Sequence, residues 1–197
     1  MNDYSLVIEK LRAFGPMSDE LEQAIRASLK TKTLRANGFW LQPSQIADSI
    51  AFLASGVLVA YHPEDEDRKI LNWLMPENNI VISVSSFFSR QPATEYIKAV
   101  EDSVLYYITY TALQNLYERF VAFNMIGRRI TEHYYMLSEQ RLLFLKRYSA
   151  EQRVVLFMET QPELYRRIAG KLVAEYLHIS HAEFYKVRSK INKKRKN

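Results

Sequence analysis

Apolar residues recur at helical spacing near both ends of the chain, whereas the middle carries short apolar runs separated by turn signals. Over residues 2–29, two stripes with a helical period predict two helices, which are separated by Gly15-Pro16. Ser18 precedes the second stripe, and its hydroxyl is suited to accept a hydrogen bond from an amide in the first helical turn. We therefore expect a helical lead-in before the middle region.

The middle region, residues 30–108, has the pattern of β-strands. Short β-branched and aromatic runs alternate with turn signals such as Asn37-Gly38 and an acidic stretch at residues 63–67. The expected strands are 31–34, 49–61, 69–75, 80–84, 96–100 and 104–108. Because no helical stripe lies between them, these runs predict an antiparallel barrel or roll.

A long helix is predicted over residues 111–148. Apolar positions there are spaced alternately by three and four residues, which is the heptad pattern of a coiled-coil seam. The seam comprises Leu116, Phe120, Phe123, Gly127, Ile130, Tyr134 and Leu137. We expect it to join two copies of the chain, because the period persists along the whole segment. A long helix packed on its own domain is the alternative.

The end of the chain, residues 168–197, predicts two short helices joined by a tight turn. Leu172 and Leu177 belong to the apolar face of the first helix, and Phe184 and Val187 to that of the second. Ser180 lies between them and is a good N-cap. This order fits a helix-turn-helix, which lays its second helix in the DNA major groove. A plain helical hairpin is the alternative.

Composition narrows the classes of function. The chain has no cysteine, which excludes disulfides, cysteine-ligated clusters and thiol catalysis. It has few glycines and none of the common phosphate-loop, serine-hydrolase or metalloprotease motifs, so we expect no enzyme, no cofactor and no metal site. A run of about 18 apolar residues and a basic-then-apolar leader are both missing. We therefore expect a cytoplasmic protein with no membrane partner.

Positive charge is concentrated at the C-terminal end. The chain carries 27 Lys and Arg against 22 Asp and Glu, and residues 186–197 hold seven of these bases and no acid. The rest of the chain is slightly acidic. A basic end beside the predicted second helix favours nucleic acid as a partner, and a solubilising tail is the alternative.

The order of lead-in, roll, long helix and helix-turn-helix resembles the Crp/Fnr family of bacterial transcription regulators, especially its short Bacteroidetes-type branch. The stretches that carry the resemblance are 87–103, which includes a Glu-Asp pair at 101 and 102, then 149–153 and 172–190. The resemblance implies an α+β fold. Its parts would be helices and a cyclic-nucleotide-binding-like jelly roll over 1–110, a dimerisation helix over 111–148 and a winged-helix-like helix-turn-helix domain over 149–197.

The segment that would bind a cyclic nucleotide departs from the family pattern. In relatives, a Gly-Glu pair and an Arg-Ser/Thr-Ala segment hold the ribose and the phosphate. Here Val81 and Ile82 stand at the Gly-Glu positions, and Ala93 stands at the arginine. The residues that would line an effector pocket are Val81, Ile82, Arg90, Ala93, Thr94 and Glu95. We expect weak or no cyclic-nucleotide binding, so the roll is either a scaffold or the site of an unknown, more apolar effector.

The resemblance also implies which residues touch DNA. By position, the base-contacting residues are His181, Ala182 and Lys186. With neighbours that can reach bases or phosphates, the expected set is Ser180, His181, Ala182, Tyr185, Lys186, Arg188, Lys190, Lys193, Lys194 and Arg195. The chain ends directly after the second helix, so we expect the basic tail to replace the phosphate contacts of a β-wing.

Two positions in this region differ from the family. Relatives have glycine at the turn, where this chain has His178, so we expect a positive φ there. Lys186 stands where relatives have arginine, which loses bidentate recognition of guanine. The expected function is a homodimeric, sequence-specific regulator that binds double-stranded DNA. The alternative is a ligand-sensing or protein-interaction module with a degenerate DNA reader.

Overall fold

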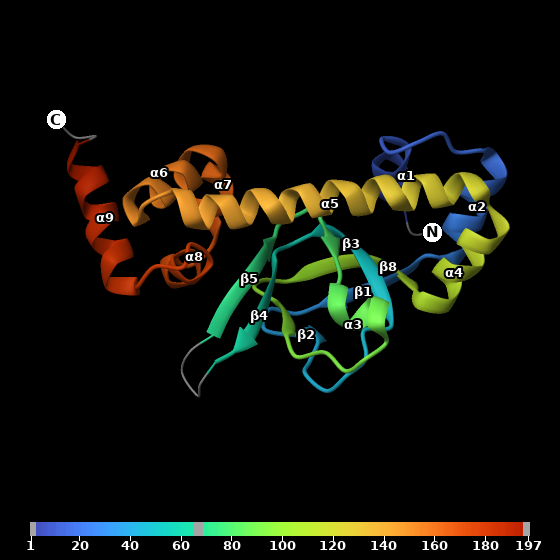
Figure 1. Ribbon diagram of the computed structural model, residues 1–197, viewed down its shortest axis with the longest axis horizontal. Helices are drawn as coiled ribbons and strands as arrows, with labels where there is room; N and C mark the ends of the chain where they lie inside the picture. The colour runs from blue at the N-terminus through green and yellow to red at the C-terminus, as the bar shows by residue number, and fades with distance from the viewer. Residues whose placement is uncertain (1–2, 65–68, 195–197) are drawn as a thin grey trace. The chain divides into compact units, whose positions relative to one another are not determined.

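The computed structural model describes residues 3–64 and 69–194 (Figure 1). The chain divides into two compact units, one formed by residues 1–60 and 74–135 and the other by residues 61–73 and 136–197. Helices and antiparallel sheets are both present, so the predicted α+β class is confirmed.

The helical lead-in consists of α1 (Ser5–Arg12) and α2 (Asp19–Ser28), as predicted. Ser18 caps α2, because its hydroxyl accepts a hydrogen bond from the Leu21 amide at 3.2 Å. Leu21 and Ile25 of α2 are almost fully buried. The helix is therefore fixed both by its cap and by an apolar face.

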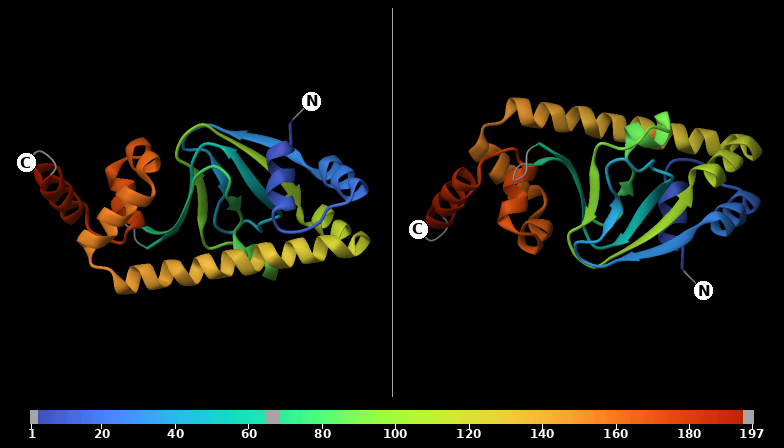
Figure 2. Two further views of the ribbon diagram at one scale, coloured as in Figure 1. Left: turned by 90° about the horizontal axis from the view of Figure 1, so that it is seen from above. Right: turned by 90° about the horizontal axis from the view of Figure 1, so that it is seen from below.

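Two four-stranded sheets form the predicted jelly roll (Figure 2). The first has the order β1 (Lys30–Leu34), β8 (Ser103–Thr109), β3 (Ser49–Ser55) and β6 (Ile80–Val81). The second has the order β2 (Phe39–Leu41), β7 (Tyr96–Ala99), β4 (Leu58–Pro63) and β5 (Lys69–Met75). Leu53, Ile97 and Leu105 are fully buried and belong to the core of the roll.

The roll differs from the expected strands in three places. The run 49–61 is two strands rather than one, because the chain turns at Gly56 with φ +99°. A Cβ at Gly56 would lie 2.1 Å from the Ser103 hydroxyl, so only glycine fits. Strand β2 was not predicted, and a short helix, α3 (Val84–Ser89), lies within a region that was expected to contain only strands.

The predicted long helix is broken at Phe120. Helix α4 (Tyr110–Arg119) ends there and α5 (Val121–Arg147) begins, because Phe120 adopts an extended backbone. The side-chain amide of Asn124 donates to the carbonyl of Tyr117 at 2.7 Å and satisfies a group that the break leaves free. A Cβ at Gly127 would lie 2.3 Å from the Tyr117 hydroxyl, so glycine permits the close approach of α4 and α5.

The predicted dimer seam lies on the face of these helices that packs within the protomer. Leu116 and Phe123 are only 4% and 5% exposed. Ile130 lines a small apolar cavity, and the Tyr134 hydroxyl accepts a hydrogen bond from the Ile80 amide at 2.7 Å. The other members, all partly covered, are Phe120, Gly127 and Leu137. Leu116 and Phe123 are therefore covered within the protomer, which corrects their assignment to a dimer contact, whereas the dimer contact expected of Phe120, Gly127, Ile130, Tyr134 and Leu137 stays a prediction.

The chain ends in four helices. They are α6 (Ala150–Thr160), α7 (Pro162–Arg167), α8 (Gly170–Tyr176) and α9 (His181–Lys194). Ser149 caps α6, and its capping box with Gln152 is complete. Val154, Phe157 and Phe184 belong to the apolar core of these helices. Among residues 3–64 and 69–194, no helix combines the length and apolar character needed to cross a membrane.

Candidate nucleic-acid interface

Helices α8 and α9, which we call the reader, are joined by a short turn as predicted. The turn is closed by two backbone hydrogen bonds, from the His178 amide to the Glu175 carbonyl at 3.2 Å and from the Ile179 amide to the Ala174 carbonyl at 3.1 Å. This pattern satisfies carbonyl groups at the end of α8. The reader therefore has the local geometry of a helix-turn-helix.

His178 adopts the left-handed conformation that the sequence predicts, with φ +52°. The ring nitrogen Nε2 lies 3.1 Å from the carbonyl oxygen of Leu71 in β5. Burial lowers the pKa of His178 below its ordinary value of 6.5, the guanidinium groups of Arg141 and Arg153 lower it further, and the hydrogen bond to Leu71 opposes them. The folded protein therefore favours the neutral form of the His178 ring.

The start of α9 is fixed by a cap and by core packing. The Ser180 hydroxyl accepts a hydrogen bond from the Glu183 amide at 3.1 Å, which confirms the predicted N-cap. Phe184 is fully buried, and a Cβ at Gly170 would lie only 2.8 Å from its ring. Glycine at the start of α8 thus lets the two helices approach closely.

Two arginines that sequence reasoning did not assign to the reader hold its turn. The guanidinium of Arg141 donates to the Tyr176 carbonyl and lies over the Tyr176 ring, 3.9 Å from its centroid. The guanidinium of Arg153 donates to the carbonyls of Leu177 and His178. Burial lowers the pKa of Arg141 below its usual range. Cations at the C-terminal end of α8 also complement its dipole.

The outer face of α9 is exposed along its length. The predicted DNA-binding residues on it that are exposed are Ser180, His181, Ala182, Tyr185, Lys186, Arg188, Lys190 and Lys193. Lys190 pairs with Glu151 at 2.7 Å, and Lys186, Arg188 and Lys193 are the other exposed bases of the set. Lys194 is the last residue of α9; its side chain and all of Arg195 lie outside the described residues.

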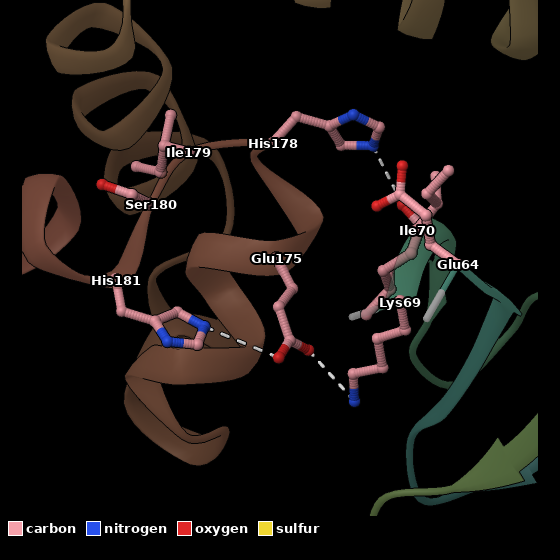
Figure 3. Close-up of a pocket in the computed structure, with 9 residues that line it drawn as sticks. Glu64, Lys69, Ile70, Glu175, His178, Ile179, Ser180 and His181 are labelled. Carbon is pink, nitrogen blue, oxygen red and sulfur yellow. Dashed lines mark hydrogen bonds and ion pairs between the residues drawn. The ribbon is translucent and has the colours of Figure 1, made fainter. Parts of the chain in front are cut away.

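A cavity of about 500 Å³ lies between the first three residues of strand β5 and the turn of the reader, all in the second compact unit (Figure 3). His178 and His181 contribute their rings from the two ends of the turn, and Glu175 contributes a carboxylate between them. Glu64 and Lys69 line the opposite side. The described residues contain no cluster of histidine and acidic side chains suited to a metal ion.

Comparisons with known proteins agree with this geometry. The family described as the cyclic nucleotide-binding domain matches residues 31–120. A structure described as a transcriptional regulator of the crp/fnr family from Eubacterium rectale has a TM-score of 0.72 and 14% identity, over 90% of this chain and 85% of that one. The chain has the Crp/Fnr fold. The predicted resemblance is thereby confirmed for the architecture.

Other structures share this Crp/Fnr fold. The regulator CLP from Xanthomonas campestris has a TM-score of 0.69 at 14% identity, over 90% of this chain and 93% of that one. FixK2 from Bradyrhizobium japonicum has a TM-score of 0.67 at 15% identity, over 84% of this chain and 85% of that one. No protein with a curated description matches the sequence.

The effector segment, residues 80–95, is built differently from an anion site. Val81 is fully buried and pairs with Ala51 across the sheet, and Ala93 is 5% exposed. Ile82 and Glu95 are half-buried and Thr94 is exposed. Ala93, which we matched from sequence to the arginine of cyclic-nucleotide-binding relatives, carries no charge.

Arg90, which belongs to the same segment, contacts other residues of the roll. Its guanidinium donates to the Ala47 carbonyl at 2.7 Å and to the Asp48 carboxylate at 3.1 Å. It also lies over the Tyr110 ring, 4.1 Å from the centroid. These contacts fix the end of α3, where Arg90 has a left-handed backbone with φ +58°. The guanidinium of Arg90 is therefore occupied by contacts within the roll.

Proposed function

We propose that this protein is a homodimeric, sequence-specific DNA-binding transcription regulator of Crp/Fnr type that acts in the cytoplasm. The observation that carries the proposal is the open face of α9, which begins at a capped N-terminus and bears Lys186, Arg188 and Lys193. The N-terminal residues of such a helix contact base edges in the major groove, and flanking bases contact phosphates.

The face of α5 opposite the predicted seam supports a dimer. Its apolar residues are exposed and lie on one side of the helix: Val121, Met125, Tyr135, Met136, Leu142 and Leu143. Val121 and Tyr135 are 86% and 72% exposed, which is costly for large apolar side chains in water. Between these two apolar ends, Arg128 pairs with Glu132 at 3.4 Å. Such polar positions in a helical seam favour one register of pairing.

A charge placed on this face should separate the protomers. We expect the double substitution Leu142→Glu and Leu143→Glu to convert the dimer to a monomer in sedimentation, because each glutamate would be buried beside its copy. Gln140→Glu adds a single negative charge at an exposed position on the edge of the apolar face and should leave the dimer intact. A double variant that stays dimeric would exclude this face as the interface.

The effector segment supports a regulator that does not respond to cyclic AMP by the usual contacts. Val81 and Ile82 supply neither the backbone approach of glycine nor the carboxylate of glutamate, and Ala93 supplies no cation. A cyclic phosphate transferred from water needs such partners. An effector of the roll, where one exists, would be a molecule without a compact negative charge.

Selection of bound sequences from a random DNA pool tests the proposed function. We expect enriched sites with two-fold symmetry and half-sites about one helical turn apart, because two copies of α9 would enter successive major grooves. Affinity for the selected site should fall steeply with salt, since basic residues would displace counterions from phosphates. A pool that shows no enrichment would favour an interaction module with a degenerate reader.

A further inference from the structure

The carboxylate of Glu175 lies between the reader and strand β5 (Figure 3). Its side chain is only 12% exposed. Oε1 lies 3.6 Å from Nε2 of His181, and Oε2 lies 3.0 Å from Nζ of Lys69. The contact of Oε2 with Lys69 is an ion pair, and Oε2 makes no hydrogen bond of good geometry. Because a covered carboxylate is costly without partners, these two neighbours are held beside it.

His181 is the first residue of α9, and its ring contacts the Glu175 carboxylate on one side and solvent on the other. Its side chain is 45% exposed, and Nε2 points toward Glu175. A separation of 3.6 Å is long for a hydrogen bond, but a carboxylate at this distance repels a ring lone pair and attracts an N–H group. This geometry favours the tautomer with its hydrogen on Nε2, which leaves the Nδ1 edge for a partner outside the protein.

We propose that Glu175 is a positioning residue for base recognition, which fixes the orientation and tautomer of His181 while Lys69 holds the carboxylate in place. With the hydrogen on Nε2, Nδ1 of a neutral ring is an acceptor. It matches the amino group of adenine or cytosine in the major groove. This inference rests on the proposed DNA-binding function and adds the chemistry of recognition at one base pair.

Loss of the carboxylate has a defined consequence for the same base pair. Without it, the hydrogen can move to Nδ1, and the exposed edge becomes a donor that matches O6 or N7 of guanine. Lys69 lies over the Tyr61 ring, 5.1 Å from its centroid, so the lysine is itself fixed within this unit. Among the residues that the structure describes, the other charged or titratable side chains that line the cavity are Glu64 and His178.

Selection from a DNA pool randomised over the half-site, with the full-length dimer, tests this inference. The variants are Glu175→Met, Glu175→Gln, His181→Ala and the double substitution of Glu175→Met with His181→Ala. We expect Glu175→Met to reduce or reverse the preference at one base pair by about five- to tenfold and to leave the other positions unchanged. Glu175→Gln keeps an acceptor oxygen and should retain most of the preference.

The double variant distinguishes recognition from folding. It should show the same preferences as His181→Ala alone, because Glu175 acts only through that ring. Lys69→Met should weaken the same single preference. If His181→Ala changes the preference at one base pair and Glu175→Met does not, or if His181→Ala changes none, the inference is overturned. A loss of affinity that is uniform across the half-site would assign Glu175 a merely structural role. A wild-type protein that enriches no site would instead contradict the proposed function.

Discussion

The reader and the effector segment both contain basic side chains within a well-packed frame, but they use them in opposite ways. In the effector segment, the guanidinium of Arg90 is bound to the Ala47 carbonyl, the Asp48 carboxylate and the Tyr110 ring. In the reader, Lys186 and Arg188 stand on an exposed face. A cation that already has protein partners gains little from an added anion, whereas an exposed cation gains a new one.

This difference indicates which of the two regions, the reader or the effector segment, can bind a charged ligand. In the reader, buried residues such as Phe184 fix the helix and leave its outer face open. In the effector segment, Val81 and Ala93 are buried apolar side chains and offer no charge to a ligand. We therefore propose that the reader recognises phosphate and that the effector segment has a supporting or apolar-ligand role.

The largest effect is expected at Lys186. Reversing its charge with Lys186→Glu should weaken binding to the selected site on the order of 100-fold, because it removes a groove contact and adds repulsion from the phosphates. Lys171→Glu makes the same charge change at an exposed position of α8 outside the predicted contact set. Fluorescence anisotropy would measure both. Equal losses in the two variants would mean that only total charge matters.

A smaller effect is expected for Arg90. Asparagine tolerates the left-handed backbone at this position but cannot make the guanidinium contacts, so Arg90→Asn should lower the free energy of unfolding by about 1–3 kcal/mol. Urea unfolding measures this loss, and DNA affinity should be unchanged under native conditions. Unchanged stability, or a specific loss of DNA binding, would remove the contrast between the two regions.

The pH dependence of stability should depend in part on His178. Because the pKa of His178 is lowered in the folded protein, the unfolded state takes up a proton first as pH falls. This contribution to stability is present above pH 6.5 and is lost as pH falls from there toward the folded-state pKa. His178→Asn keeps a residue that tolerates positive φ and should flatten this part of the profile in urea unfolding. A variant profile identical to that of the wild type would contradict the assignment.

The smallest expected effect is that of cyclic AMP on the wild-type protein. Millimolar cyclic AMP should leave the melting temperature unchanged, because ligand-linked stabilisation requires binding to the folded state. The triple substitution Val81→Gly, Ile82→Glu and Ala93→Arg introduces the residues that the resemblance implies for nucleotide binding and tests the segment directly. A clear rise in the melting temperature of the wild type would show that its effector segment binds the nucleotide by other contacts.

Local chemistry made part of the molecule predictable from sequence. The caps at Ser18, Ser149 and Ser180 each depend on a hydrogen bond that spans three residues, so sequence alone is sufficient to find them. The positive φ of His178 was predictable because glycine occupies that position in the family that the chain resembles. Architecture followed from the order of these elements.

The features that the sequence did not predict depend on contacts between residues that are separated along the chain. The break at Phe120 accompanies the packing of Tyr117 against Gly127 after the chain reverses, and no short window of sequence contains that contact. The heptad pattern in α5 identified an apolar face but could not say whether the protomer or a partner covers it. The link from Lys69 to Glu175 joins residues about a hundred positions apart, so only the folded chain brings them together.

The central claim is that two copies of this chain read one duplex through paired α9 helices. Native mass spectrometry of the protein mixed with a duplex that carries the selected site tests it most directly. The account predicts a complex of two chains and one duplex, which disappears with Leu142→Glu/Leu143→Glu and persists with Gln140→Glu. A complex of one chain and one duplex with full affinity, or no complex with any selected duplex, would contradict it.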